Sequence, residues 1–235
     1  MLQAAAVDDD RLERMLARRV VGEPLEQVLG WAEFCGLRVA VAPGVFVPRR
    51  RTEFLVERAV QLLGGGTRPI VVDLCCGTGA IGVAIAERLD VELHAADVDP
   101  DAVACARRNL TMGEVHEGDL YDALPVGLRG RVDLLAVNAP YVPTDEIHLM
   151  PPEARLHEHH VALDGGLDGL DLHRRVAARA PEWLRPGGTL LIETSRAQAD
   201  ATAAACAAAG LRPTTLSRDE SWLVEAVAPS VSSRT

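Results

Sequence analysis

The sequence predicts an α/β protein with a doubly wound, Rossmann-like sheet of seven mostly parallel strands and an antiparallel edge strand. Apolar strand-like runs alternate with amphipathic helical runs over residues 69–210, and a glycine-rich turn follows the first apolar run. Apolar strands separated by helices indicate a parallel sheet with both faces covered. The last two strand-like runs are adjacent in the sequence, which favours an antiparallel hairpin at the edge.

The N-terminal part predicts two helices and a hairpin ahead of the sheet. Residues 9–20 place apolar side chains at helical spacing behind a run of aspartates. A short second helix is expected to begin at Pro24 and to stop at Gly30. Residues 36–47 alternate around a Pro-Gly pair, which is typical of a β-hairpin. Thr52 is expected to cap a further helix that ends at the next glycine run.

These patterns divide the chain into a short helical and hairpin segment (1–50), an α/β domain (51–228) and a disordered tail (229–235). The strands expected in the α/β domain are 69–74, 91–97, 114–119, 132–138, 189–194, 211–216 and 221–227, and the later helices are 80–89, 100–110, 168–180 and 197–210.

Composition restricts the class of protein. The 235 residues contain 48% hydrophobic residues, but no uninterrupted apolar stretch of about 18, so no membrane span is expected. The N-terminus soon reaches an acidic run and does not resemble a secretory signal, which predicts a cytoplasmic protein. Five scattered cysteines without a CxxC pair predict reduced thiols. The net charge of -10 argues against nucleic acid as a partner.

The strongest local motif is the turn DLCCGTGAIG, residues 73–82, between a buried strand and a helix. Ligands lie against the backbone N–H groups at this edge of a doubly wound sheet, and Gly77 and Gly79 permit close approach. Asp97 ends the next strand, where its carboxylate can accept both hydroxyls of a ribose. Asp119 supplies a third acid where the following strand ends. Together these features predict an adenosyl cofactor.

The rival cofactor is NAD, whose turn usually reads GxGxxG. Here the turn reads GTGAIG and is preceded by Asp73 at the end of its strand, which is typical of methyltransferases. We therefore expect S-adenosyl-L-methionine, with S-adenosyl-L-homocysteine as the product. Asp99 is the weaker candidate for the ribose because it is expected to cap the next helix.

Asn138-Ala139-Pro140-Tyr141 follows the fourth strand and faces the same edge of the sheet. A planar nitrogen is difficult to methylate because its lone pair is delocalised. The Asn138 side-chain oxygen and the Ala139 carbonyl can accept its N–H groups and orient it. The Tyr141 ring can stack on the flat group. These residues predict catalysis on an amide or an aniline-like amine.

The run His157-Glu158-His159-His160 suggests a metal site, but its spacing is not HExxH, and we expect no metal.

The combination of these segments resembles the HemK/PrmC family of protein-glutamine N5-methyltransferases, from about Gly22 to about Val227. The motifs that carry the resemblance are DLCCGTGAIG, ADVDPDAV, GDL and NAPYVP, flanked by GEPLEQVLGWAEFCGL, VPRRRTEFLVERA and ALDGGLDGLDLHRR.

The resemblance implies a class I S-adenosylmethionine-dependent methyltransferase fold and a role for each motif. The family's ribose-binding acid falls on Asp97, and a residue beside the adenine falls on Leu120, next to Asp119. The implied cofactor loop is Cys75, Cys76, Gly77, Thr78 and Gly79, and Asn138, Ala139, Pro140 and Tyr141 are implied to hold the substrate amide, with Asn138 also facing the cofactor.

Three features depart from the family pattern. Cys75 replaces the usual first loop glycine, and Ala139 replaces the first proline of Asn-Pro-Pro-Tyr. Only about twenty residues precede GEPL, so we expect a shortened N-terminal helical domain.

The resulting expectation is methylation of a glutamine side chain in a protein, with the Gly-Gly-Gln loop of a release factor as the implied substrate. Two alternatives remain open. One is N6-methylation of adenine in nucleic acid, and the other is a small-molecule N-methyltransferase or a non-catalytic cofactor-binding relative.

Overall fold

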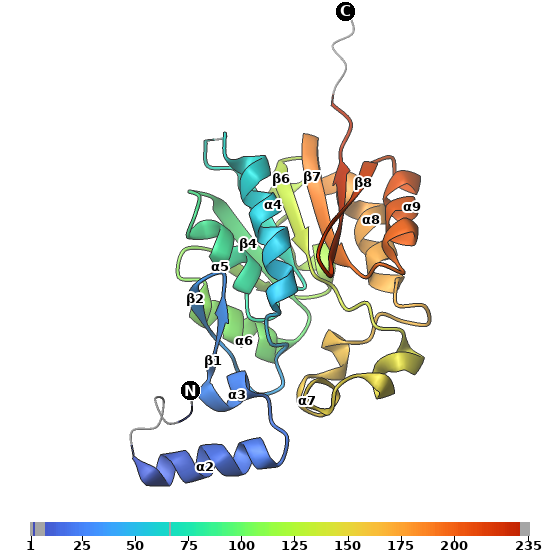
Figure 1. The fold of residues 1–235 in the computed structure, drawn as a ribbon. Helices are drawn as coiled ribbons and strands as arrows, with labels where there is room; N and C mark the ends of the chain where they lie inside the picture. Colours follow the sequence, from blue (N-terminus) through green and yellow to red (C-terminus); the bar gives the residue numbers. More distant parts are fainter. Residues whose placement is uncertain (1, 3–7, 66, 231–235) are drawn as a thin grey trace, which may run out of the picture.

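A seven-stranded sheet runs through the centre of the molecule and is covered by helices (Figure 1). The computed structural model describes residue 2, residues 8–65 and residues 67–230; from residue 231 onward the expected tail lies outside this range. The strands of the sheet are β3 (Ile70–Leu74), β4 (Glu92–Asp97), β5 (Glu114–Glu117), β6 (Val132–Val137), β7 (Leu184–Thr194), β8 (Arg212–Arg218) and β9 (Ser221–Val227).

The strand order is β5-β4-β3-β6-β7-β9-β8. The first five of these strands are parallel, and β9 pairs antiparallel with both β7 and β8. The predicted doubly wound sheet with an antiparallel edge is therefore confirmed. Because β3 and β6 are neighbours, the glycine-rich turn and the Asn138 segment emerge side by side.

Helices and shorter elements surround the sheet. The α-helices are α2 (Asp9–Val20), α3 (Leu25–Leu29), α4 (Glu53–Leu63), α5 (Ala80–Ala86), α6 (Pro100–Asn109), α7 (Pro152–His157), α8 (Asp171–Trp183) and α9 (Ala199–Ala208). The remaining elements are the strands β1 (Trp31–Phe34) and β2 (Leu37–Ala40) and the 3-10 helices η1 (Arg50–Thr52), η2 (Leu120–Ala123), η3 (Val126–Leu128), η4 (Thr144–Leu149) and η5 (His160–Ala162).

Alternate side chains of the buried strands enter two hydrophobic cores. On β3, Val71 packs with α4, α5 and α6, whereas Val72 packs with α8 and α9. Both side chains are fully buried. This two-sided burial explains why the strand sequences are almost continuously apolar.

The N-terminal helices follow the predicted pattern. Helix α2 spans Asp9–Val20, and α3 ends at Gly30, whose φ of 82° is the left-handed conformation that favours glycine. Helix α4 ends at Leu63, directly before the glycine run.

The hairpin predicted for residues 36–47 is wrong. The observed hairpin pairs β1 with β2, and its two-residue turn is Cys35-Gly36, with φ values of 53° and 78°. Two positive φ values match the right-handed twist of a tight hairpin. The Pro43-Gly44 pair instead lets the chain approach another loop closely, because the Gly44 carbonyl accepts the His159 N–H at 2.7 Å.

The predicted cap at Thr52 is only half correct. Thr52 precedes α4, but its side chain makes no capping hydrogen bond. Its hydroxyl faces Asn138 instead, as described below.

Candidate active site

A cleft of about 740 Å³ lies where the carboxyl ends of β3, β4 and β6 meet. The part of the chain that precedes α4 forms one wall with Phe34, Phe46 and Arg51, and the segment after β6 forms another. Most residues predicted for the site line this cleft: Cys75, Cys76, Gly77, Thr78, Asp97, Asp119, Leu120, Asn138, Ala139, Pro140 and Tyr141. Asp73 and Gly79 were also predicted, but they lie behind the wall.

The glycine-rich turn is fixed by its own backbone and by Asp97. The Gly77 N–H donates to Oδ2 of Asp97 at 2.8 Å, and the Gly79 N–H donates to the Cys76 carbonyl at 2.7 Å. Gly79 has a φ of 75°, and a Cβ there would collide with Leu110. Gly79 is therefore needed for packing against α6 and does not contact the cleft.

The turn also contains Cys75 and Cys76, and both residues line the cleft. Cys75 adopts a φ of 56°, a conformation that glycine tolerates better than any other residue. Burial raises the pKa of both thiols well above the usual range, and the nearby carboxylates of Asp73 and Asp97 add to this. Both side chains are therefore protonated at neutral pH.

Asp73 supports the turn from behind. Its Oδ2 accepts the Gly82 N–H at 2.9 Å, and the other carboxyl oxygen has no partner among the described residues. Burial raises the pKa of Asp73 to about 8. A Cβ on Gly82 would meet Leu93 at 3.2 Å, so glycine here allows close packing of α5 against β4.

Asp97 and Asp119 bring carboxylates to the cleft wall. Asp97 accepts the N–H groups of Gly77 and Asp99, yet burial still raises its pKa. Asp119 pairs with Arg175 at 2.5 Å, and Leu120 follows it with a φ of 51°. Asp99 caps α6, as predicted, by accepting the Asp101 N–H.

This wall fits S-adenosylmethionine. Adenosine offers two ribose hydroxyls as donors, and the sulfonium is a cation, so a wall that contains half-buried carboxylate acceptors such as Asp97 complements both. Gly77 lines the cleft and has no side chain, so a ligand can approach the backbone of the turn closely there. Asp97 would hold the ribose, and Leu120 would contact the adenine.

Asn138 is oriented by a residue that sequence reasoning did not assign to the site. Its Nδ2 donates to Oγ1 of Thr52 at 3.3 Å. This bond uses the amide as a donor, so Oδ1 remains an acceptor, and in the described part of the chain no donor reaches it. Asn138 and Ala139 both line the cleft.

Arg51 and Glu193 complete the polar side of the site and were also missed. Glu193 lies near the end of β7 with an almost fully buried side chain; Arg51 Nε donates to it at 3.1 Å, and the Tyr141 hydroxyl lies 3.5 Å away. Burial raises the Glu193 pKa, against the opposing effects of Thr52 and Arg51. The sequence signal that could have identified Glu193 is a charged residue directly after the apolar run LLI.

The glycines of GGLDGL fix the Tyr141 segment. A Cβ on Gly165 would lie 2.7 Å from the Cα of Tyr141, and a Cβ on Gly169 would collide with the Tyr141 carbonyl. That carbonyl accepts Nε2 of Gln198 at 2.8 Å. The motif thus allows the loop before α8 to pack directly on the segment that contains Tyr141.

The side chains of the histidine-rich run make polar contacts within the protein. Nδ1 of His159 lies 2.6 Å from Oδ2 of Asp99, and Glu158 pairs with Arg49 at 2.5 Å. These contacts join the segment around α7 to the β4–α6 turn and to the N-terminal segment.

Comparison with known proteins agrees with this site. Residues 36–158 match the methyltransferase small domain family. The chain is 40% identical to the release factor glutamine methyltransferase of Geobacter sulfurreducens over 79% of its length and 66% of the relative's. It is also 40% identical to the enzyme of that name from Streptomyces coelicolor, over 81% of this chain and 69% of the relative. The chain belongs to the release factor glutamine methyltransferase family.

The chain is also similar to a methyltransferase that is named for small-molecule substrates. The 4-amino-L-phenylalanine/4-methylamino-L-phenylalanine methyltransferase of Streptomyces pristinaespiralis is 37% identical over 78% of this chain and 65% of the relative. Family membership alone thus leaves the acceptor to be argued from the site.

Solved structures confirm the class I methyltransferase fold. A methyltransferase from Pyrococcus furiosus matches 95% of this chain and all of its own, with a TM-score of 0.58 and 15% identity. A 16S rRNA methyltransferase from T. thermophilus matches 84% of this chain and 49% of its own, with a TM-score of 0.61 and 20% identity. None of the helices in the described part of the chain has the length and apolar character that a bilayer crossing requires.

Proposed function

We propose that the protein transfers a methyl group from S-adenosylmethionine to the side-chain amide nitrogen, N5, of a glutamine in a peptide chain release factor. The observation that carries this proposal is the orientation of Asn138. Its amide is bound to Thr52 through Nδ2, which leaves Oδ1 as an acceptor beside the cleft. An acceptor at this place suits a primary amide, which presents N–H donors.

The residues act by orienting one planar nitrogen. When bound, S-adenosylmethionine supplies an electrophilic methyl group on sulfur. Oδ1 of Asn138 and the Ala139 carbonyl accept the two N–H groups of the glutamine amide and hold its nitrogen in line. Burial raises the pKa of Tyr141, so its ring remains a neutral phenol that can stack on the amide. The proton leaves to solvent after the transfer.

The proposed partner is a protein. The net charge of -10 opposes attraction to nucleic acid, whose binding depends mainly on Lys and Arg. A release factor works at ribosomes, so the proposal places the protein in the cytoplasm.

The test is isotope transfer to a purified release factor. The protein, the factor and deuteromethyl S-adenosylmethionine are incubated, and peptide mass spectrometry locates the label. We expect one methyl group on the glutamine of the Gly-Gly-Gln loop. Asn138→Ala is expected to lose about 100-fold or more in turnover, by analogy with other residues that orient the reacting group, while calorimetry still shows cofactor binding. A cofactor-bound protein that leaves the factor unlabelled would refute the proposal.

A second candidate is N-methylation of a small aromatic amine. The similarity to the Streptomyces pristinaespiralis enzyme favours it, because an aniline nitrogen is also planar. The discriminating measurement compares kcat/KM for the release factor with kcat/KM for 4-amino-L-phenylalanine. A higher value for the amine would select this candidate, and label in added DNA or RNA would select the nucleic-acid alternative.

A further inference from the structure

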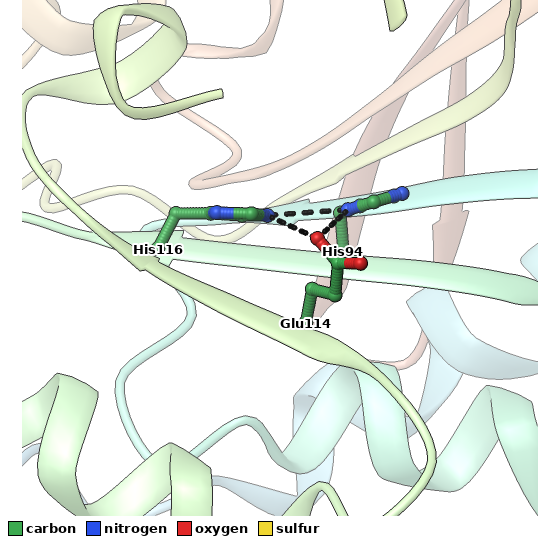
Figure 2. Close-up of side chains that lie close together, drawn as sticks. All are labelled: His94, Glu114 and His116. Atoms are coloured by element: carbon green, nitrogen blue, oxygen red, sulfur yellow. Dashed lines mark hydrogen bonds and ion pairs between the residues drawn. The ribbon is translucent and has the colours of Figure 1, made fainter. Parts of the chain in front are cut away.

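Two histidines and a glutamate from β4 and β5 meet outside the cleft (Figure 2). His94 is paired with Glu114 in the parallel register of these strands, and His116 lies two residues further along β5. Glu114 and His116 therefore share the sheet face on which His94 lies. The cleft residues on β4 begin only at Ala96, so this cluster is a separate feature.

Three ligand atoms form a closed triangle. Nδ1 of His94 lies 3.1 Å from Nε2 of His116, and Oε2 of Glu114 lies 3.7 Å and 3.8 Å from these nitrogens. A single point in the plane of this triangle is about 2.1 Å from all three atoms, which matches Zn–N and Zn–O bond lengths of about 2.0–2.2 Å.

A second carboxylate orients the first ligand. Nε2 of His94 lies 3.4 Å from Oε1 of Glu92, so a proton on Nε2 leaves the lone pair of Nδ1 free. Metal-binding histidines commonly donate their other ring N–H to a carboxylate in this manner.

We propose that His94, Glu114 and His116 bind a divalent transition-metal ion, with zinc as the best match. Two imidazoles and one carboxylate select zinc, cobalt or nickel over magnesium and calcium. The side chain of Glu114 is 68% exposed, so water can complete the coordination. The ion would join the edge strand β5 to β4. This differs from the absence of a metal site expected from the sequence, because strand register, and no local motif, assembles the ligands.

The other group of this kind serves as an internal control. Asp99, Asp101 and His159 also lie close together, with Nδ1 of His159 2.6 Å from Oδ2 of Asp99. This group offers one imidazole and two carboxylates, which suit zinc less well than two imidazoles and one carboxylate, so we expect zinc to bind first at His94, Glu114 and His116.

The test titrates zinc into tag-free, chelator-treated full-length protein under reducing conditions, against a chromophoric chelator. We expect one equivalent to bind, at least tenfold weaker binding in His116→Ala and Glu114→Gln, and unchanged binding in His159→Ala. Because Glu114 is exposed, E114Q keeps the test valid if a histidine variant misfolds. Zinc should also raise the melting temperature of the wild type but not of E114Q.

Titration with cobalt in place of zinc distinguishes nitrogen and oxygen ligands from cysteine thiolates, because the two kinds of site absorb differently. We expect visible absorption bands of a four- or five-coordinate nitrogen and oxygen site that disappear in E114Q. Thiolate-to-cobalt absorption would assign the metal to cysteines and overturn the proposal. Less than one equivalent in the wild type, or equal affinity in all variants, would also overturn it.

Discussion

At the scale of single residues, Thr52, directly before α4, contacts the side chain proposed to orient the substrate, Asn138. Its hydroxyl accepts Nδ2 of Asn138, which determines which end of the amide faces the substrate. Orientation contributes strongly to transfer rates, because small displacements of a reacting group are costly.

We therefore predict that Thr52→Val lowers kcat by roughly tenfold, the equivalent of about 1.4 kcal/mol. The affinity for S-adenosylmethionine should be unchanged, since Thr52 is not among the residues that would hold the cofactor. Steady-state kinetics and calorimetry measure the two effects. Thr52→Ser retains the hydroxyl and should recover most of the rate; wild-type turnover in Thr52→Val would contradict the prediction.

Cys75 adopts a backbone conformation that suits glycine. A non-glycine residue with left-handed φ costs about 1–2 kcal/mol, whereas glycine costs about 0.5–1 kcal/mol in the unfolded chain. We predict that Cys75→Gly raises the free energy of unfolding by up to about 1 kcal/mol. Cys75→Val should lower it, because a β-branched side chain tolerates positive φ poorly. Urea denaturation measures both, and the reverse order of stabilities would refute this explanation.

Asp73 makes stability depend on pH. Its pKa is about 8 in the folded protein and 3.8 as the ordinary value, so between these values the folded state binds the proton more tightly. Its contribution to stability is therefore complete below about pH 3.8 and declines as the pH rises through 8. Burial lowers the pKa of His173 to about 4, which gives an opposite trend between pH 4 and 6.5.

Comparing Asp73→Asn with the wild type isolates the pH dependence that Asp73 contributes, because His173 is present in both the variant and the wild type. We predict that the unfolding free energy of Asp73→Asn minus that of the wild type increases from pH 4 to pH 8. Urea denaturation at several pH values measures this difference. A difference independent of pH would show that Asp73 is ionised in the folded state.

At the scale of elements, an ion pair to a buried carboxylate joins the N-terminal segment to the segment around α7. Arg49 donates to Glu158 at 2.5 Å, and the only other donor to this fully buried side chain in the described residues is the Val47 N–H at 3.2 Å. Both segments border the cleft, so this pair holds two of its walls together.

We predict that Arg49→Ala lowers the free energy of unfolding by about 2–4 kcal/mol, because it leaves a buried carboxylate without its countercharge. Adding Glu158→Gln in the same chain should recover part of this loss, since no charge then remains to be compensated. Denaturation of the single and double variants measures the coupling. Additive losses in the double variant would show that the two side chains do not interact.

At the scale of the whole molecule, the N-terminal segment shares a core with the sheet. Phe34 and Val39 from the hairpin pack in the same cluster as Val71 and Leu134. We propose that residues 1–50 and 51–228 fold as one cooperative unit, although the sequence pattern divides them.

A fragment that begins at residue 51 tests this proposal. We predict that it loses cooperative thermal unfolding, because it lacks the hairpin side chains that cover one face of the core. Circular dichroism of the fragment and of the full chain measures the difference. A fragment as stable as the full chain would establish two independent domains.

The fold and much of the cleft wall could be predicted because their signals are local. The hydrophobic periodicity of a strand or a helix can be recognised within about ten residues. Parallel strands then bring their carboxyl ends to one edge of the sheet. The contact between Asn138 and Thr52 spans 86 residues, and the one between Arg51 and Glu193 spans 142. The zinc ligands depend on strand register in the same way. Such contacts require coordinates, because composition and spacing do not encode register.

The protonated thiols at the cofactor turn have a consequence for the chemical durability of the protein. Peroxide and alkylating reagents attack thiolates, and burial keeps Cys75 and Cys76 in the unreactive form. A pair of sulfurs beside a methyl donor could otherwise be methylated or cross-linked. We therefore expect the raised pKa of the two thiols to slow both their methylation and their oxidation.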